Sequence, residues 1–177
     1  MSKTFWQDGL RFECTKCSAC CRHDPGFVFL SAMDLRKLLE YSGLHLQVFL
    51  QMYVKKVDTG SGFWLSLREK PNNDCILWDS NGCTMYDARP IQCSTYPFWD
   101  GVIESSRVWS RESIDCPGID RGSIIVAADI FGRLQMNRSN IRINLAYDVV
   151  LESIDEDTLL GFPRLASNTT YPGKITE

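Results

Sequence analysis

A dense run of cysteines near the N-terminus is the feature that most constrains this chain. Four of them fall within eight residues, as Cys14-x2-Cys17-x2-Cys20-Cys21. Thiolate sulfur is a soft, charged ligand, and the C-x2-C spacing lets two sulfurs converge on one ion across a tight turn. Three cysteines at successive three-residue steps also hold three corners of the cubane cluster in bacterial ferredoxins. The run therefore predicts a metal site, and its spacing favours iron–sulfur over zinc.

Four more cysteines follow the run at wider spacing. They are Cys75, Cys83, Cys93 and Cys116. Because cytoplasmic thiols are kept reduced, eight cysteines in that compartment indicate metal binding or redox chemistry and not a disulfide framework. A thiol redox motif would explain one C-x2-C pair, and burial as small apolar side chains would explain single cysteines, but neither explains eight.

The grouping of the eight sulfurs stays open. Cys116 is followed by Pro117, as is the remote fourth ligand of a ferredoxin-type cluster, yet the other downstream cysteines are equally available. Adjacent side chains point in different directions, so we expect Cys20 and Cys21 not to share one mononuclear ion. The chain then holds two four-sulfur sites, or one cluster plus structural or redox cysteines.

Basic residues near the cysteines are candidates for balancing thiolate charge. Lys16, Arg22 and Arg89 are predicted to offset it. We also expect Arg89 to bond backbone carbonyls and shape the loop around Cys93. His23 is either a further ligand or a turn residue.

Apolar periodicity predicts the elements between the cysteines. Ser31-x-x-Asp34 is a capping motif for a helix that Gly43 ends, and a second helical pattern covers residues 46–57. A third helix is predicted from Ser123, which would cap it, to residues 137–140. Strands are predicted over residues 27–30, 63–67 and 75–78, with Asn81-Gly82 as a hairpin turn and residues 102–109 as a further hairpin or strand.

These elements predict an α+β fold, a small cysteine-rich metal-binding domain of short strands and hairpins covered by two or three helices. We expect a cysteine-cluster domain over residues 1–122. Residues 123–177 are expected to form a helix packed on that domain and an extended tail.

Composition and missing motifs narrow the function. A net charge of −3 and 44% hydrophobic residues are ordinary for a globular protein and give no general attraction to nucleic acid or anionic membrane. No apolar stretch is long enough to cross a bilayer, and the N-terminus lacks a signal-peptide pattern, so we expect a cytoplasmic protein. Motifs of nucleotide-binding proteins, serine hydrolases and zincins are absent. The expected partners are metal ions and a protein partner or substrate, not nucleic acid or membrane.

Two separated motifs resemble one known family in order and spacing. They are Cys14-x2-Cys17-x2-Cys20-Cys21-Arg22, and Gly82-Cys83-x2-Tyr86-x2-Arg89-Pro90-x2-Cys93 with Tyr96-Pro97-Phe98, followed by a last isolated cysteine. Over residues 12–118 the chain resembles the bacterial cysteine-cluster family described as a zinc- or iron-chelating domain with a CxxCxxCC signature. The resemblance implies eight metal ligands, namely Cys14, Cys17, Cys20, Cys21, Cys75, Cys83, Cys93 and Cys116.

A similar cysteine cluster occurs in the bacterial flagellin lysine methylase, where it is thought to hold an iron–sulfur cluster. This chain departs from the family pattern at Ser94, where arginine is usual, and it lacks a recognisable separate substrate domain. Three functions follow. The first is a [4Fe-4S] protein for electron transfer, sensing or assistance in protein modification; the second is an interaction module stabilised by one or two Zn²⁺ ions without catalysis; the third is protein lysine methylation. Whether the chain is an enzyme stays open.

Overall fold

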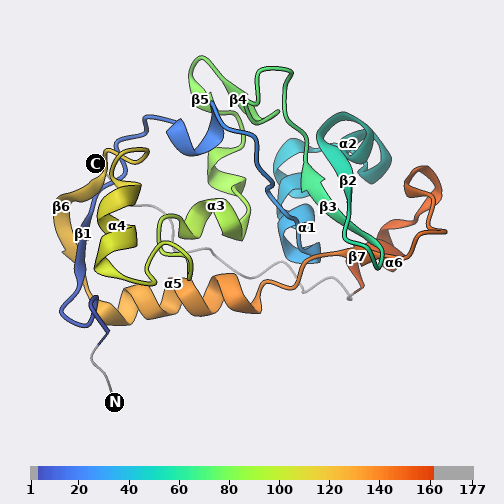
Figure 1. Cartoon of the computed structure of the whole chain (residues 1–177). Helices are drawn as coiled ribbons and strands as arrows, with labels where there is room; N and C mark the ends of the chain where they lie inside the picture. The colour runs from blue at the N-terminus through green and yellow to red at the C-terminus, as the bar shows by residue number, and fades with distance from the viewer. Residues whose placement is uncertain (1–3, 162–177) are drawn as a thin grey trace.

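The computed structural model describes residues 4–161, and within them a small α+β domain of short antiparallel strands and helices, as the sequence predicts (Figure 1). The predicted tail from residue 162 onward lies outside the described residues. The helices are α1 (Ala32–Ser42), α2 (Leu46–Tyr53), α3 (Ile91–Thr95), α4 (Ser106–Glu112), α5 (Ala127–Ser139) and α6 (Glu156–Leu160), with the 3-10 helices η1 (Ala19–Cys21), η2 (Tyr86–Ala88) and η3 (Leu151–Ser153). The strands are β1 (Leu10–Phe12), β2 (Val54–Asp58), β3 (Phe63–Leu67), β4 (Trp78–Asp79), β5 (Gly82–Cys83), β6 (Ile119–Ile125) and β7 (Asn144–Leu145).

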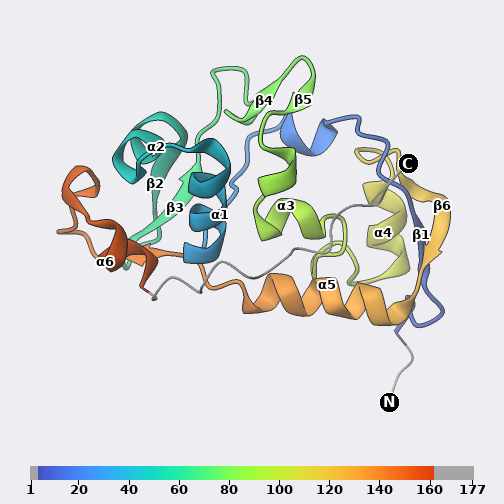
Figure 2. The same cartoon turned by 180° about the vertical axis from the view of Figure 1, so that it is seen from behind.

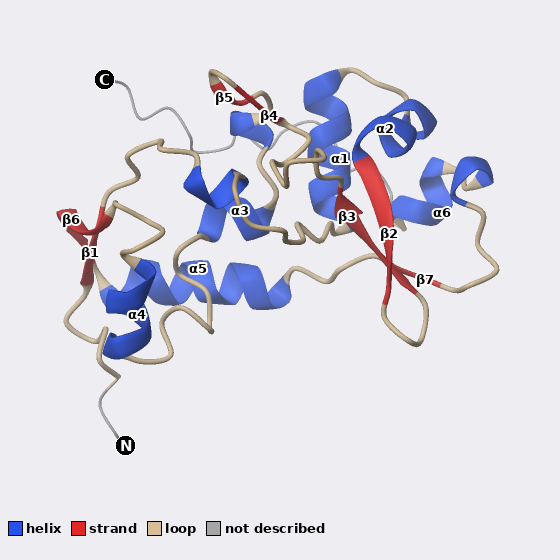
Figure 3. Cartoon of the chain, turned by 45° about the horizontal axis from the view of Figure 1, so that its top comes forward, coloured by secondary structure: helices blue, strands red, loops and turns tan. Residues whose placement is uncertain are grey.

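The strands form three separate antiparallel sheets, β1-β6, β2-β3-β7 and β4-β5. Figures 1 and 2 place β1-β6 and α4 at one end of the molecule and the three-stranded sheet with α1 and α2 at the other. Helix α5 runs along one side from the first end toward the second. The hairpin β4-β5 and helix α3 lie between the two ends, and Figure 3 shows the same arrangement with the strands in red.

The first hydrophobic cluster forms beneath α1 and α2. Helix α1 begins with a complete capping box, in which Ser31 Oγ accepts from Asp34 N–H and the Asp34 carboxylate accepts from Ser31 N–H. Its apolar stripe then buries Leu35 and Leu38 against Phe49 of α2 and Leu65 of β3, and all four are 0% exposed. Burying each such side chain contributes about 1.5–3 kcal/mol.

A second cluster lies at the other end, around Phe98. The ring of Phe12 meets Phe98 edge to face at 5.6 Å between centroids, and Trp109 of α4 stacks on it at 5.7 Å. Ile130 of α5 joins this cluster, whereas residues 143–160 contribute to the first one. Residues after 122 thus pack into both clusters, and the predicted domain boundary there stays a prediction.

Five predicted elements are wrong in part. The second helix ends at Tyr53 because the β-branched Val54 and Val57 continue as strand β2, paired with Leu67 and Trp64. The third helix begins at Ala127, since Ser123 belongs to strand β6 and caps nothing.

Residues 106–112 form helix α4 and not a strand, because Ser105 Oγ accepts from Val108 N–H and starts a helical turn. The strands predicted over residues 27–30 and 75–78 are shorter than expected. Phe29 makes only an isolated bridge with Ser66, and a turn from Cys75 to Trp78 delays strand β4.

Candidate metal centre

The N-terminal cysteine run is held in a tight loop between β1 and the rest of the domain. Glu13 N–H donates to the Gly118 carbonyl at 3.1 Å, which fixes the start of the loop. Lys16 and Ser18 then adopt the left-handed region, with φ of 55° and 62°, and turn the chain into η1. Such conformations are uncommon outside glycine, so surrounding structure must hold them.

The adjacent cysteines Cys20 and Cys21 lie on η1 with their Sγ atoms 3.9 Å apart. The expectation that they point in different directions is therefore wrong, because the 3-10 turn brings the two sulfurs to one side. Two thiolates bound to one tetrahedral zinc ion at about 2.3 Å lie roughly 3.8 Å apart. The pair has the spacing needed to bind one ion together.

The hairpin β4-β5 brings two further cysteines beside the run. Asp79 pairs with Gly82 across the turn, so the predicted Asn81-Gly82 hairpin is confirmed. Cys83 lies on β5, and Cys75 lies in the turn before β4, where its N–H donates to the Cys21 carbonyl at 2.8 Å. This backbone bond ties the hairpin directly to the N-terminal run.

Helix α3 carries Cys93 and is anchored to the first hydrophobic cluster. The Asp34 carboxylate, 1% exposed, accepts from Ile91 N–H at 2.7 Å at the start of α3. Next to Cys93, the side chain of Gln92 accepts from Phe29 N–H at 3.1 Å and donates to the Phe27 carbonyl at 2.6 Å. These bonds fix the position of Cys93 relative to α1.

Six cysteines line one solvent-open cavity of about 580 Å³. They are Cys14, Cys20, Cys21, Cys75, Cys83 and Cys93. Among the described residues, no three His, Cys, Asp or Glu side chains are close enough together to hold a single ion. The cysteines therefore line a shared space and do not converge on a point.

The remaining two cysteines, Cys17 and Cys116, do not line this cavity. Cys116 is 8% exposed and lies just after α4, where its N–H donates to the Glu112 carbonyl at 2.8 Å. Burial raises the pKa of its thiol, a backbone hydrogen bond at Gly118 opposes the rise, and the nearby Cys17 adds to it. Cys17 and Cys116 therefore lie close enough to interact electrostatically.

In the cavity, hydrogen bonding lowers the pKa of one thiol, and burial raises the pKa of others. The hydrogen bond from Cys21 lowers the pKa of Cys20 to about 7, and the same bond raises the pKa of Cys21. Burial raises the pKa of Cys75, Cys83 and Cys93. A bound cation opposes that effect of burial, because it stabilises the thiolate form.

The predicted basic residues lie at the cavity, with Arg89 in the most direct role. Its guanidinium adds to the lowering of the pKa of Cys20 and opposes the rise that burial causes in the pKa of Cys83. Its Nε donates to the Tyr86 carbonyl at 2.9 Å, which confirms the predicted carbonyl bond. Arg22 lies over the Trp78 ring at 4.0 Å and 3.6 Å from the Asp74 carboxylate.

Lys16 also lines the cavity, whereas His23 lies exposed in a left-handed turn outside it. His23 is therefore placed as a turn residue.

Sequence reasoning missed Tyr96, whose hydroxyl donates to Glu112 at 2.7 Å, and both residues line the cavity. In the sequence, Tyr96 is marked only by its place in the Tyr96-Pro97-Phe98 motif, and Glu112 only by its position near Cys116.

Comparison with models of known protein families shows to which family the chain belongs. A model described as "Putative zinc- or iron-chelating domain", with the signature CxxCxxCC, matches residues 13–117. The chain belongs to the CxxCxxCC family. The matched segment begins one residue before Cys14 and ends one residue after Cys116, so the CxxCxxCC domain includes all eight cysteines. This membership supports binding of a metal ion, zinc or iron.

No solved structure matches the chain. Within residues 4–161, none of the helices has the length and apolar character needed to cross a membrane.

Proposed function

We propose that the chain holds a [4Fe-4S] cluster in the sulfur-lined cavity and uses it for electron transfer or redox sensing. The observation that carries the proposal is that six cysteines line one cavity of about 580 Å³, while no three potential ligands among the described residues are close enough to hold a single ion. Cysteines bind separate corners of a cubane, whereas a Cys₄ zinc site needs its sulfurs to converge on one ion.

Three elements and the N-terminal run supply the proposed ligands. Cys75 comes from the turn before β4, Cys83 from β5 and Cys93 from α3. One of the adjacent Cys20 and Cys21 completes the four. Mutual electrostatic effects support this set, because Cys20, Cys75 and Cys83 each raise the pKa of Cys93. That the other cysteines are also ligands remains a prediction.

Exposure of the site supports a redox role. Cys14 and Cys20 are exposed at the mouth of the cavity. An iron–sulfur cluster supplies one-electron chemistry, and its potential depends on hydrogen bonds to sulfur, nearby charge and solvent exposure. Arg89 contributes positive charge beside Cys20 and Cys83, which favours their thiolate forms.

The proposal is tested by purifying the chain without oxygen and measuring iron, zinc, acid-labile sulfide and visible absorption. We expect a brown protein with about four iron and about four sulfide ions per chain. A colourless protein with zinc and no sulfide would contradict the cluster.

A zinc-stabilised interaction module is the second candidate. The 3.9 Å separation of the Cys20 and Cys21 sulfurs favours it, because that spacing suits two ligands of one tetrahedral ion. One or two zinc ions per chain without sulfide would support it. The third hypothesis, lysine methylation, has no support of its own in the geometry and is tested by incubating the chain with flagellin and a methyl donor.

A further inference from the structure

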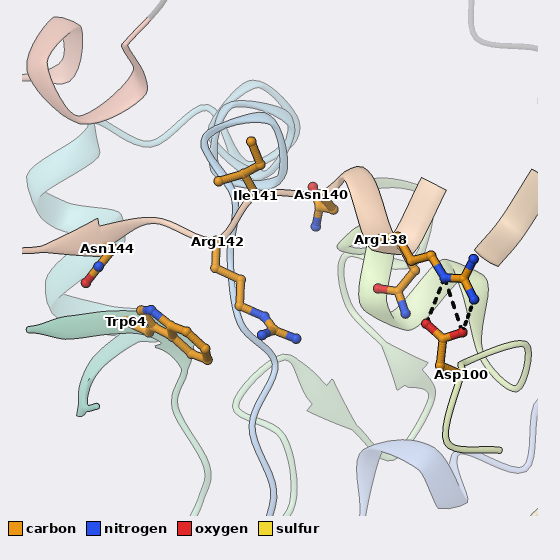
Figure 4. Close-up of a pocket in the computed structure, with 8 residues that line it drawn as sticks. Trp64, Asp100, Arg138, Asn140, Ile141, Arg142 and Asn144 are labelled. Carbon is orange, nitrogen blue, oxygen red and sulfur yellow. Dashed lines mark hydrogen bonds and ion pairs between the residues drawn. The ribbon is translucent and has the colours of Figure 1, made fainter. Parts of the chain in front are cut away.

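A second cavity, of about 480 Å³, shares no lining residue with the sulfur-lined cavity. It lies where the end of α5 and the segment leading to β7 face Trp64 of β3 and Asp100 (Figure 4). Its volume falls in the range of about 300–1,000 Å³ that is typical of small-molecule sites. The metal-binding function accounts for none of its residues.

Strand-like alternation builds one wall of this cavity. Asn140 and the exposed Ile141 both line the cavity, and alternation begins after them: Arg142 and Asn144 line the cavity, while Ile143 and Leu145, 9% and 8% exposed, pack into the first hydrophobic cluster. Alternate side chains of an extended segment point to opposite faces, so burial of Ile143 and Leu145 directs Arg142 and Asn144 toward the cavity.

Arg142 is the central cation of the site. Its guanidinium lies 5.1 Å from the ring centroid of Phe29 and 4.8 Å from that of Trp64. Across the described part of the chain, no carboxylate or carbonyl accepts from this guanidinium. The two rings are edge to face with each other, 5.0 Å between centroids, so both lie to one side of the guanidinium, and its N–H groups are left for a ligand.

The second arginine of the cavity is already neutralised. Arg138 Nε donates to both oxygens of Asp100 at 3.2 and 3.0 Å, and its terminal nitrogen also bonds that carboxylate. Figure 4 shows this pair facing Arg142 and Trp64 across the cavity. With Asp100 cancelling Arg138, the lining carries one net positive charge, from Arg142.

Three asparagines add amide groups to the same lining. The side chains of Asn137 and Asn144 have no hydrogen-bond partner within residues 4–161. Asn140 Nδ2 donates to Asp34 at 2.8 Å, and its Oδ1 is buried without a partner. An amide both donates and accepts, so the lining is matched to a ligand that carries an amide of its own.

We propose that this cavity binds a carboxylate next to an amide, as found at the C-terminus of a polypeptide or in an N-acylated amino acid. The planar guanidinium of Arg142 binds the carboxylate through two parallel hydrogen bonds, and the side-chain amides of Asn137 and Asn144 bind the adjoining amide. A single net positive charge suits a monoanion, and a phosphate dianion would leave negative charge uncompensated.

The test is calorimetric titration of the metal-loaded chain with N-acetylglycine and with its neutral analogue N-acetylglycinamide. We expect the acid to bind at least about tenfold more tightly, because the analogue loses the charge-assisted bonds to Arg142. A tripeptide acid that binds more tightly than N-acetylglycine identifies a polypeptide end as the ligand, and the reverse order identifies a small N-acylated acid. Equal binding of acid and amide, or tighter binding of inorganic phosphate, overturns the proposal.

A matched pair of variants places the binding at this cavity. Arg142→Gln should weaken N-acetylglycine binding at least about tenfold, whereas Arg107→Gln, at an exposed position on α4 outside the cavity, should leave it unchanged. Unchanged affinity in Arg142→Gln, or an equal loss in Arg107→Gln, would contradict the site. Metal content should be the same in both variants, so the outcome is independent of the proposed function.

Discussion

The hydrophobic cluster under α1 and α2 and the sulfur-lined cavity are organised by different forces. In the cluster, side chains such as Leu35, Leu38 and Phe49 are 0% exposed and lie on regular, capped elements. At the cavity, half-buried or exposed thiols lie on loops, turns, the two-residue strand β5 and the five-residue helix α3. Two residues of the N-terminal loop, Lys16 and Ser18, adopt left-handed conformations.

The difference indicates where the chain depends on metal. Burial of apolar surface stabilises the cluster without help from a ligand. Burial raises the pKa of Cys75, Cys83 and Cys93 and so disfavours their thiolate forms; under the proposed function, a bound cation would supply the energy that organises the cavity. The two regions should therefore respond differently to mutation and to metal removal.

The largest expected effect is loss of metal on substituting a cavity cysteine. Cys93→Ser should reduce bound iron or zinc to below about a tenth of the unaltered level, because it removes a central thiolate ligand. Metal analysis of the purified variant measures this. Cys17→Ser is the matched control, since Cys17 does not line the cavity and the variant should retain the metal bound there. Equal loss in both variants would instead support a shared site for all the cysteines.

Removing metal by chelation should loosen the cavity and spare the cluster. Amide hydrogen exchange in residues 13–24 and 75–83 is expected to speed up by at least about tenfold, while the helices α1 and α2 keep their protection. Uniform protection before and after chelation would show that metal does not organise the loops. Uniform loss would show that the cluster cannot persist alone.

Substituting a buried core residue should lower the stability of the fold without loss of metal. Phe49→Ala is expected to lower the free energy of unfolding by about 3–5 kcal/mol, because it leaves a cavity among fully buried side chains. Chemical denaturation of the metal-loaded chain measures the change. Metal per folded chain should stay the same, and a variant that lost metal at this position would break the distinction between the two regions.

Asp34 connects the two regions, and its substitution should have a smaller, mixed effect. Its buried carboxylate accepts from Ser31, from Ile91 N–H and from Asn140. Asp34→Asn should cost about 1–3 kcal/mol of stability, because one buried donor then faces another. Weaker metal retention under a competing chelator should accompany it, since Ile91 starts the helix that carries Cys93. Asp87→Asn, near the same helix and without such bonds, is the control.

The sequence predicted the parts that depend on local chemistry. The capping box at Ser31, the glycine end of α1 at Gly43 and the Asn81-Gly82 turn all follow from neighbouring residues, and each is confirmed. The CxxCxxCC family was likewise recognisable from the spacing of its cysteines, and the family match confirms it.

What the sequence did not predict depends on tertiary contacts. The apolar spacing that continues through Val54 and Val57 fits a helix, but pairing with β3 makes it a strand. The direction of the Cys20 and Cys21 sulfurs depends on the 3-10 helix η1, which follows the left-handed residues Lys16 and Ser18. A backbone hydrogen bond from Cys75 to the Cys21 carbonyl fixes the other end of η1. The second cavity is invisible in sequence because its residues come from β3, the segment around Asp100 and the end of α5.

The central claim is that cysteines from separate segments bind one metal group in the sulfur-lined cavity. Iron K-edge X-ray absorption of the anaerobically purified chain tests it most directly. We predict a first coordination shell of sulfur alone and a second shell of neighbouring iron atoms, with both lost in Cys93→Ser. A shell of nitrogen and oxygen ligands, or a spectrum that is the same in Cys93→Ser, would contradict it.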